Sequence, residues 1–217
     1  MQGDGIRLTE TTSVIHPSFK HGKNFKMGNF LVVEQDVEVG DNVSIGHFAT
    51  ILCPTVIGDF VTIAPSVVIG AEGQEWSRDE AGVLREIPHK SGVIIGNHVD
   101  IRANTTVQRG VARPTVIGDG TKIGPNCNIS HEVRIGRDCL ITGMTMIAGS
   151  AEIGDRVYIG PQTIVGSKQK IGNNVNIRIG SLVLNDIQDG LTVAGRPAKP
   201  LEPFEHRNEK LKKDEAQ

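Results

Sequence analysis

An isoleucine or valine recurs at every sixth residue along most of this chain. The series runs unbroken from Val33 to Ile69, resumes from Ile95 to Val107, and continues from Ile117 to Val183. The fifth position of each hexad is small or β-branched, as in Ala49 and Val61. Two residues separate it from the next aliphatic, so both side chains share one face of a short strand. A period of six excludes helical heptads and predicts triangular coils of three strands each, stacked about 4.8 Å apart.

The composition agrees with a solenoid that buries small aliphatic residues. Aromatic residues make up only 4% of the 217 residues, whereas glycine occurs 26 times. Glycine often follows the aliphatic position, as at Gly40 and Gly58, where we expect the missing Cβ to let the strand bend into a turn. With 23 Lys and Arg against 25 Asp and Glu, the chain lacks the basic excess typical of nucleic-acid binding. No signal pattern and no apolar run of about 18 residues occurs, so we expect a cytoplasmic protein without a membrane span.

Two interruptions break the period, and function on a solenoid concentrates at such breaks. Residues 71–92 form a polar, charged insertion, and residues 108–114 (QRGVARP) form a short bulge. Loops longer than about 12–15 residues are usually functional or disordered. A tolerated surface insertion remains the alternative. Five side chains of the insertion are candidates for contact with a substrate or another subunit, and the sequence does not single out any of them: Trp76, Arg78, Arg85, His89 and Lys90.

The hexad series resembles the hexapeptide-repeat family over residues 15 to 200. The resemblance implies an all-β fold, a left-handed parallel β-helix, with the handedness taken from the family alone. It implies one β-helix domain over residues 1–200 with a protruding loop at 71–92, and a homotrimer with sites between subunits. Residues 201–217, which carry balanced charge, are expected to form a short C-terminal helix or tail that covers the last coil.

The stretch from Thr105 to Arg137 resembles the region around the catalytic histidine of acyltransferases that N-acylate nucleotide-linked amino sugars. It shares the TT-x-x-RG segment and the histidine before a valine and IG with the UDP-3-O-acylglucosamine N-acyltransferases of lipid A synthesis. The pair His131 and Glu132 is similar to the His-Glu or His-Asp motif of bacterial amino-sugar N-acetyltransferases. The resemblance implies that His131 is the general base and, together with the 18-residue spacing, that Gly149 donates its amide to the oxyanion. Glu132 is expected to orient His131 or to stabilise its imidazolium.

The chemistry of thioesters explains why one histidine suffices. A thioester is already activated, so transfer to an amine needs a base for the proton and donors for the developing oxyanion. An unperturbed histidine, with a pKa near 6.5, is neutral at cytosolic pH. Cys53, Cys127 and Cys139 lack CxxC spacing, so we expect neither a disulfide framework nor a metal, and we expect Cys127 and Cys139 to fill the core.

The acyl donor is expected to be acyl-CoA, most simply acetyl-CoA. The segment VAGRPAKP (193–200) is similar to the ending common in CoA-dependent members of the family. Lipid A N-acyltransferases have a second histidine where this chain has Lys168, and a separate N-terminal domain of about a hundred residues, whereas the coils start almost immediately here. Four cations near the last coils are candidates for CoA phosphates: Lys168, Lys170, Arg178 and Arg196. Trp76 and Arg109 are candidates for substrate binding.

The sequence therefore favours an N-acyltransferase that moves an acyl group from acyl-CoA to the amine of a nucleotide-linked amino sugar in lipopolysaccharide or other cell-surface glycan synthesis. The first alternative is a UDP-3-O-acylglucosamine N-acyltransferase-like enzyme that uses acyl carrier protein. The second is a non-enzymatic hexapeptide scaffold. A zinc-dependent carbonic anhydrase of the same fold is disfavoured, because paired histidines at a spacing of five are absent. The sugar, the nucleotide and the acyl chain length stay open.

Overall fold

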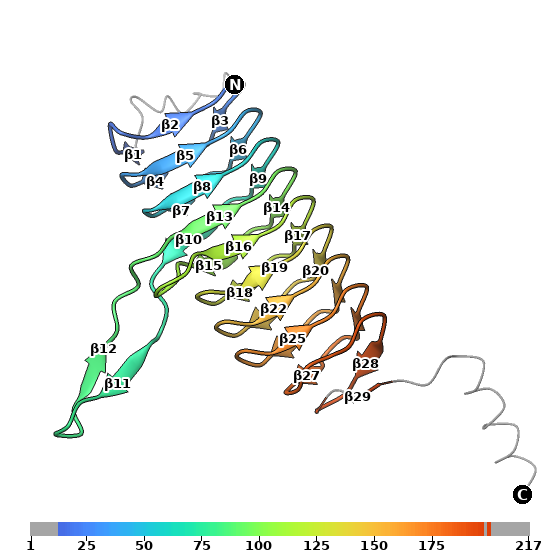
Figure 1. The fold of residues 1–217 in the computed structure, drawn as a ribbon. Helices are drawn as coiled ribbons and strands as arrows, with labels where there is room; N and C mark the ends of the chain where they lie inside the picture. Colours follow the sequence, from blue (N-terminus) through green and yellow to red (C-terminus); the bar gives the residue numbers. More distant parts are fainter. Residues whose placement is uncertain (1–12, 198, 201–217) are drawn as a thin grey trace, which may run out of the picture.

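Three β-sheets, parallel except for the last strand of the third, wind around a common axis in the computed structural model, which describes residues 13–197 and 199–200 (Figure 1). The first sheet contains β1 (Val14–Ile15), β4 (Val32–Val33), β7 (Thr50–Ile51), β10 (Val68–Ala71), β15 (Thr106–Gln108), β18 (Asn128–Ile129), β21 (Met146–Ile147), β24 (Ile164–Val165) and β27 (Leu182–Val183). The second contains β2 (Lys20–His21), β5 (Val37–Val39), β8 (Thr55–Ile57), β13 (Val93–Ile95), β16 (Thr115–Ile117), β19 (Arg134–Ile135), β22 (Glu152–Ile153) and β25 (Lys170–Ile171). The third contains β3 (Lys26–Met27), β6 (Ser44–Ile45), β9 (Thr62–Ile63), β14 (Asp100–Ile101), β17 (Lys122–Ile123), β20 (Leu140–Ile141), β23 (Tyr158–Ile159), β26 (Asn176–Ile177), β28 (Thr192–Ala194) and β29 (Lys199–Pro200).

Each coil contributes one short strand to each sheet, which confirms the all-β parallel β-helix expected from the period of six and agrees with the left-handed sense expected from the family. The aliphatic series fills the interior, and Ile51, Ile69 and Ile129 have no exposed surface. Cys127 and Cys139 are buried in the same core, as predicted. Within the described residues no helix occurs, and hence none that would be long and apolar enough to cross a membrane. The expected C-terminal helix or tail, 201–217, lies outside the described residues.

The glycines that follow the aliphatic position serve coil stacking rather than the bend that we expected. A Cβ on Gly40 would lie 2.2 Å from Oδ1 of Asp59 and 2.8 Å from the backbone of Gly58 in the next coil. The left-handed backbone of this turn falls instead at Asn42, whose φ is 58°. Asparagine tolerates that conformation better than most residues. Glycine is therefore required there because the next coil approaches closely.

All changes of coil length occur at one corner of the triangle, the corner that joins the first sheet to the second. We call it the loop-bearing corner. Equivalent residues of regular coils are 18 apart. The spacing rises to 38 across the insertion 71–92, to 22 across the bulge 108–114, and falls to 16 at the last coil. The strands on both sides of the corner stay in register except at the end of β10, where the pairing with β15 shifts between Ile69 and Ala71.

The insertion leaves the solenoid as an antiparallel hairpin. Its strands are β11 (Trp76–Arg78) and β12 (Leu84–Glu86), which project from the body between β10 and β13 (Figure 1). The ends of the insertion return to the corner, where Lys90 and Ser91 donate backbone hydrogen bonds to Val111 and Gly110 of the bulge. Insertion and bulge therefore form one continuous surface.

Candidate active site

His131 lies in the turn after β18, on the loop-bearing corner, directly against the next coil. Ser150 donates its backbone N–H to the His131 carbonyl at 2.9 Å, which sets Gly149 opposite the imidazole. A Cβ on Gly149 would lie 2.6 Å from Nε2 and 2.7 Å from Cε1 of His131. Only glycine therefore lets the ring occupy this position. The Gly149 N–H donates to no acceptor among the described residues, so it is free for an oxyanion.

The insertion folds back over His131 and leaves only 16% of its side chain exposed. On one side, Oε2 of Glu75 lies 3.5 Å from Nε2 of His131. On another, the His89 ring stands edge-on to the His131 ring, with 5.3 Å between centroids and 83° between planes. Gly73 leaves room for both rings, because a Cβ there would lie 2.8 Å from Nε2 of His89. The insertion thus forms walls of the site around His131.

His89 is the site residue that the sequence could not single out from the insertion. Its side chain is 3% exposed, and neither ring nitrogen has a hydrogen-bond partner. Nδ1 of His131 is likewise buried without a partner. Burial, followed by the neighbouring His131, lowers the pKa of His89 below its usual value, so its ring is neutral near pH 7. Buried nitrogens without partners are rare in folded proteins, and they gather at catalytic and ligand sites.

Arg109, expected to bind substrate, is held by partners within the protein. Nη1 donates to the Cys53 carbonyl at 2.8 Å, and Nη2 pairs with the Glu72 carboxylate. The guanidinium thereby ties the start of the insertion to a preceding coil. Its Nε is buried without a hydrogen-bond partner among the described residues. Arg109 is thus the third residue of the site, after His89 and His131, with an unsatisfied nitrogen. Arg109 therefore anchors the insertion to the solenoid.

Glu132, expected to orient His131 or to stabilise its imidazolium, makes no hydrogen bond to that ring in the described part of the chain. Its Oε1 accepts the backbone N–H groups of Ala112 at 2.8 Å and Arg113 at 3.0 Å, and its Oε2 accepts the Ser150 hydroxyl at 3.2 Å. Burial raises the pKa of Glu132, but the two amide hydrogen bonds outweigh it, and the pKa lies below its usual value. Glu132 therefore holds the bulge 108–114, and the carboxylate beside His131 is that of Glu75.

The structure places the remaining candidates from the sequence in three regions. Trp76 begins β11 with half of its surface exposed. Lys168 lies at the loop-bearing corner, where it donates its backbone N–H to the Gly149 carbonyl at 3.0 Å, and Lys170 begins β25 of the second sheet. Arg178 and Arg196 lie at the corner between the third and first sheets. Within one chain, the four cations therefore fall into two separate groups rather than one phosphate-binding group.

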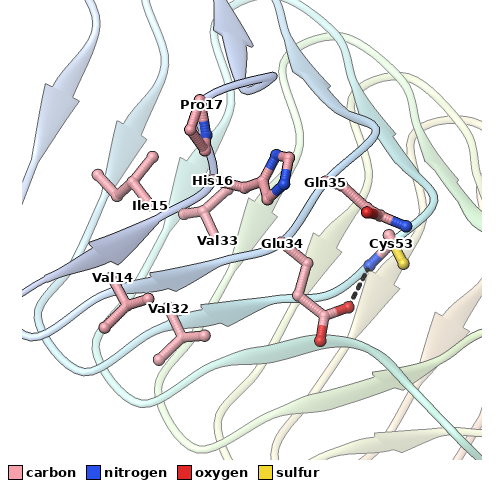
Figure 2. A pocket seen from close by; sticks show the side chains of 9 residues that line it. All are labelled: Val14, Ile15, His16, Pro17, Val32, Val33, Glu34, Gln35 and Cys53. Atoms are coloured by element: carbon pink, nitrogen blue, oxygen red, sulfur yellow. Dashed lines mark hydrogen bonds between the residues drawn. The ribbon is translucent and has the colours of Figure 1, made fainter.

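A cavity of about 600 Å³ opens on the loop-bearing corner at the first three coils (Figure 2). Its lining is Val14, Ile15, His16, Pro17, Val32, Val33, Glu34, Gln35 and Cys53. Glu34 accepts the Cys53 N–H at 3.1 Å, and Arg109 binds the Cys53 carbonyl, so this cavity adjoins the anchor of the insertion. Burial, followed by Glu34, raises the pKa of the Cys53 thiol, which keeps it protonated and a poor nucleophile.

The fold and this corner define a class: a hexapeptide-repeat solenoid with a histidine site under an inserted loop. A family model described as bacterial transferase hexapeptide (six repeats) matches residues 36–71 and 114–149. The second segment includes His131 and Gly149. Over these two segments the chain is similar to that hexapeptide-repeat family.

Two curated relatives are similar over the greater part of this chain. The UDP-3-O-acylglucosamine N-acyltransferase of Rhizobium meliloti is 46% identical over 156 residues, which cover 72% of this chain and 44% of the relative. The enzyme of the same name from Methylorubrum extorquens is 34% identical over 152 residues, covering 70% and 43%. The chain thus spans less than half the length of these relatives.

Solved structures show the same fold. The UDP-N-acetylglucosamine acyltransferase from Campylobacter jejuni superposes with a TM-score of 0.64 at 27% identity, covering 87% of this chain and 74% of that one. The Arabidopsis UDP-N-acetylglucosamine acyltransferase superposes with a TM-score of 0.69, covering 94% and 76%. At 22% identity, this second likeness supports the fold alone.

Proposed function

We propose that this protein transfers an acyl group from a thioester to the amine of a nucleotide-linked amino sugar. The observation that supports the proposal most is the set of unpartnered nitrogens on His89 and His131, packed against Gly149. Each unsatisfied buried polar group costs about 1–3 kcal/mol. A purely structural scaffold has no reason to keep several of them at its one irregular corner, so this set argues against the non-enzymatic alternative.

The acceptor and donor follow the relatives rather than the interpretation that the sequence favoured. Both curated relatives are UDP-3-O-acylglucosamine N-acyltransferases, so we propose a UDP-linked 3-O-acylated amino sugar as acceptor. The argument for acyl-CoA relied on the segment VAGRPAKP, on Lys168 in place of a second histidine and on a group of cations near the last coils, and within one chain these cations fall into two separate groups. We therefore propose an acyl carrier protein thioester as donor, with free acyl-CoA as the competing candidate.

The geometry supports a single base and an amide donor. His131 takes a proton from the acceptor nitrogen, which then attacks the thioester carbon. The Gly149 N–H stabilises the oxyanion, and the imidazolium returns its proton to the leaving thiolate. Among the described residues, no group of three His, Cys, Asp or Glu side chains has metal-binding geometry.

We also propose that the protein assembles as a homotrimer through its first sheet. The strands of this sheet contain no charged residue, whereas both other sheets carry several. Its outward face exposes Val14, Val32, Met146 and Ile164. Monomeric proteins rarely leave such an apolar face uncovered, and a second copy there would lie beside the loop-bearing corner. Sedimentation should show a trimer at micromolar concentration, and a stable monomer would contradict the proposal.

A direct assay tests the function. Purified protein is incubated with UDP-3-O-acylglucosamine and either acyl carrier protein thioesters or acetyl-CoA, and thiol release is followed together with the mass of the sugar product. Transfer from the carrier-protein donor supports the proposal. Transfer from acetyl-CoA alone would restore the short-chain CoA hypothesis, and absence of transfer from both would contradict the proposed function.

A further inference from the structure

Glu75 places a carboxylate beside the nitrogen that would act as base. Its Oε2 lies 3.5 Å from Nε2 of His131, and its side chain is 43% exposed where that of His131 is 16% exposed. Glu75 therefore approaches the imidazole from its more exposed side. Its side chain makes no hydrogen bond to the described residues, in contrast to Glu72, which is paired with Arg109.

The charges around Glu75 leave its negative charge uncompensated. Arg109 is neutralised by Glu72, and the burial of His89 keeps that ring neutral at physiological pH. When His131 is also neutral, as a base must be, the site carries one net negative charge at Glu75. A half-buried site of this kind attracts a cation.

We propose that Glu75 selects a protonated amine as the acyl acceptor, an inference that rests on the proposed function. The ammonium group docks between the Glu75 carboxylate and Nε2 of His131. Glu75 is then a specificity-determining residue, and one role of the insertion 71–92 is to position it beside His131.

The proton balance of the reaction fits this arrangement. The ammonium carries three protons and the amide product one. One of the two leaves through Nε2 of His131, which passes it to the sulfur of the departing thiolate as the C–S bond breaks and the C–N bond forms. The other passes to solvent along the exposed Glu75 carboxylate. No oxidant, reductant or metal is needed.

An acceptor with a hydroxyl in place of the amine gains less from Glu75. A neutral hydroxyl donates one hydrogen bond to the carboxylate, whereas an ammonium adds the attraction between two opposite charges to its hydrogen bond. The variant Glu75→Gln keeps the shape and removes the charge. It should leave the fold intact, because the Glu75 carbonyl accepts the Ile87 N–H at 2.9 Å through the backbone.

The experiment compares two acceptors on three proteins. Calorimetry at pH 7 measures binding of UDP-3-O-acylglucosamine and of its 2-hydroxy isostere, UDP-3-O-acylglucose, to the wild-type chain, Glu75→Gln and Glu80→Gln. Glu80 is an exposed carboxylate of the same insertion and serves as the matched control. The wild type and Glu80→Gln should bind the amine about 10–100-fold more tightly, and Glu75→Gln should reduce this ratio to about threefold or less.

The outcomes separate this inference from the proposed function. An unchanged ratio in Glu75→Gln, or an equal loss in Glu80→Gln, would overturn the role of Glu75 while acyl transfer by the wild type continued. Glu75→Asp, which keeps the charge, should retain a preference for the amine, and its loss there would also count against the inference. A wild type that neither binds nor acylates either sugar would contradict the proposed function, and the role of Glu75 with it.

Discussion

The corner between the second and third sheets and the loop-bearing corner use the same solenoid in opposite ways. At the former, side-chain oxygens of successive coils accept backbone N–H groups in a ladder: Asp59 binds the N–H of Asp41 at 2.7 Å, and Asn97 binds that of Asp59 at 2.8 Å. At the latter, ring nitrogens of His89 and His131 are buried without partners. A saturated corner contributes stability, whereas an unsatisfied corner keeps groups available for a ligand.

The loop-bearing corner can be longer than the other corner because of how a solenoid is held together. Strand pairing and the aliphatic core fix the sheets, so a corner may gain residues without disturbing its neighbours. The strands on each side of the insertion 71–92 pair in the same register as elsewhere up to Ile69, and the register shifts only between Ile69 and Ala71, where the insertion begins. Residues added at a corner are therefore free to serve function, and here all of the additions fall on the corner that carries His131.

The largest expected effect is a loss of acyl-transfer rate, and it is tested by replacing one histidine from each corner. His131→Ala should lower the acyl-transfer rate about 10²–10⁴-fold, as for loss of a general base, and leave the melting temperature nearly unchanged. His98→Ala is the matched control, because His98 lies in a turn of the saturated corner and stacks on Phe60 at 4.8 Å. It should leave the rate unchanged. Steady-state assays and thermal unfolding of both variants are the measurements.

Near-full activity of His131→Ala would remove this residue from the mechanism. An equal loss of rate in His98→Ala would show that the two corners do not divide stability and function as the contacts indicate.

The periodic part of the molecule is predictable from the sequence because each coil repeats the same contacts. Ile or Val at every sixth residue specifies three strands per coil, and the 18-residue spacing alone places Gly149 opposite His131. The role of Gly40 is not predictable in the same way. The sequence shows that glycine is needed there, but only the structure shows that the next coil, rather than the bend, requires it.

The irregular part is not predictable, because its contacts join residues that no period relates. Glu75 and His89 reach His131 only through the path of the insertion. The sequence assigns Glu132 to its neighbour His131, but its carboxylate binds amides of the bulge about 20 residues earlier. Lys170 and Arg178 are only eight residues apart in the sequence, but a corner and the whole of β26 lie between them, so they do not form one group of cations.

A methyl group added at one glycine of each corner should separate the two corners. In Gly149→Ala, the new Cβ meets the His131 ring, so the ring must move, and we expect about a 10–100-fold loss of rate with a small change in stability. In Gly40→Ala, the Cβ meets backbone of the next coil, and we expect about 1–3 kcal/mol of destabilisation with little change in rate. Denaturant unfolding and steady-state kinetics measure both. The same pattern of losses in the two variants would contradict the division.

The smallest expected effect concerns how the free energy of unfolding falls at acidic pH. The folded-state pKa of Glu132 lies below its ordinary value of 4.5, so its contribution is complete above that pH and is lost as the pH falls through the folded-state pKa. Glu132→Gln should remove about 1 kcal/mol from the free energy of unfolding at pH 7 and flatten its fall below pH 4.5. Glu38→Gln is the control, because Glu38 pairs with Lys20 on the exposed second sheet, where ion pairs contribute little. Denaturant unfolding from pH 3 to 7 should leave the Glu38→Gln curve on that of the wild type. If both variants lost the same free energy of unfolding, the hydrogen bonds from the bulge to Glu132 would contribute no more to stability than an exposed ion pair does.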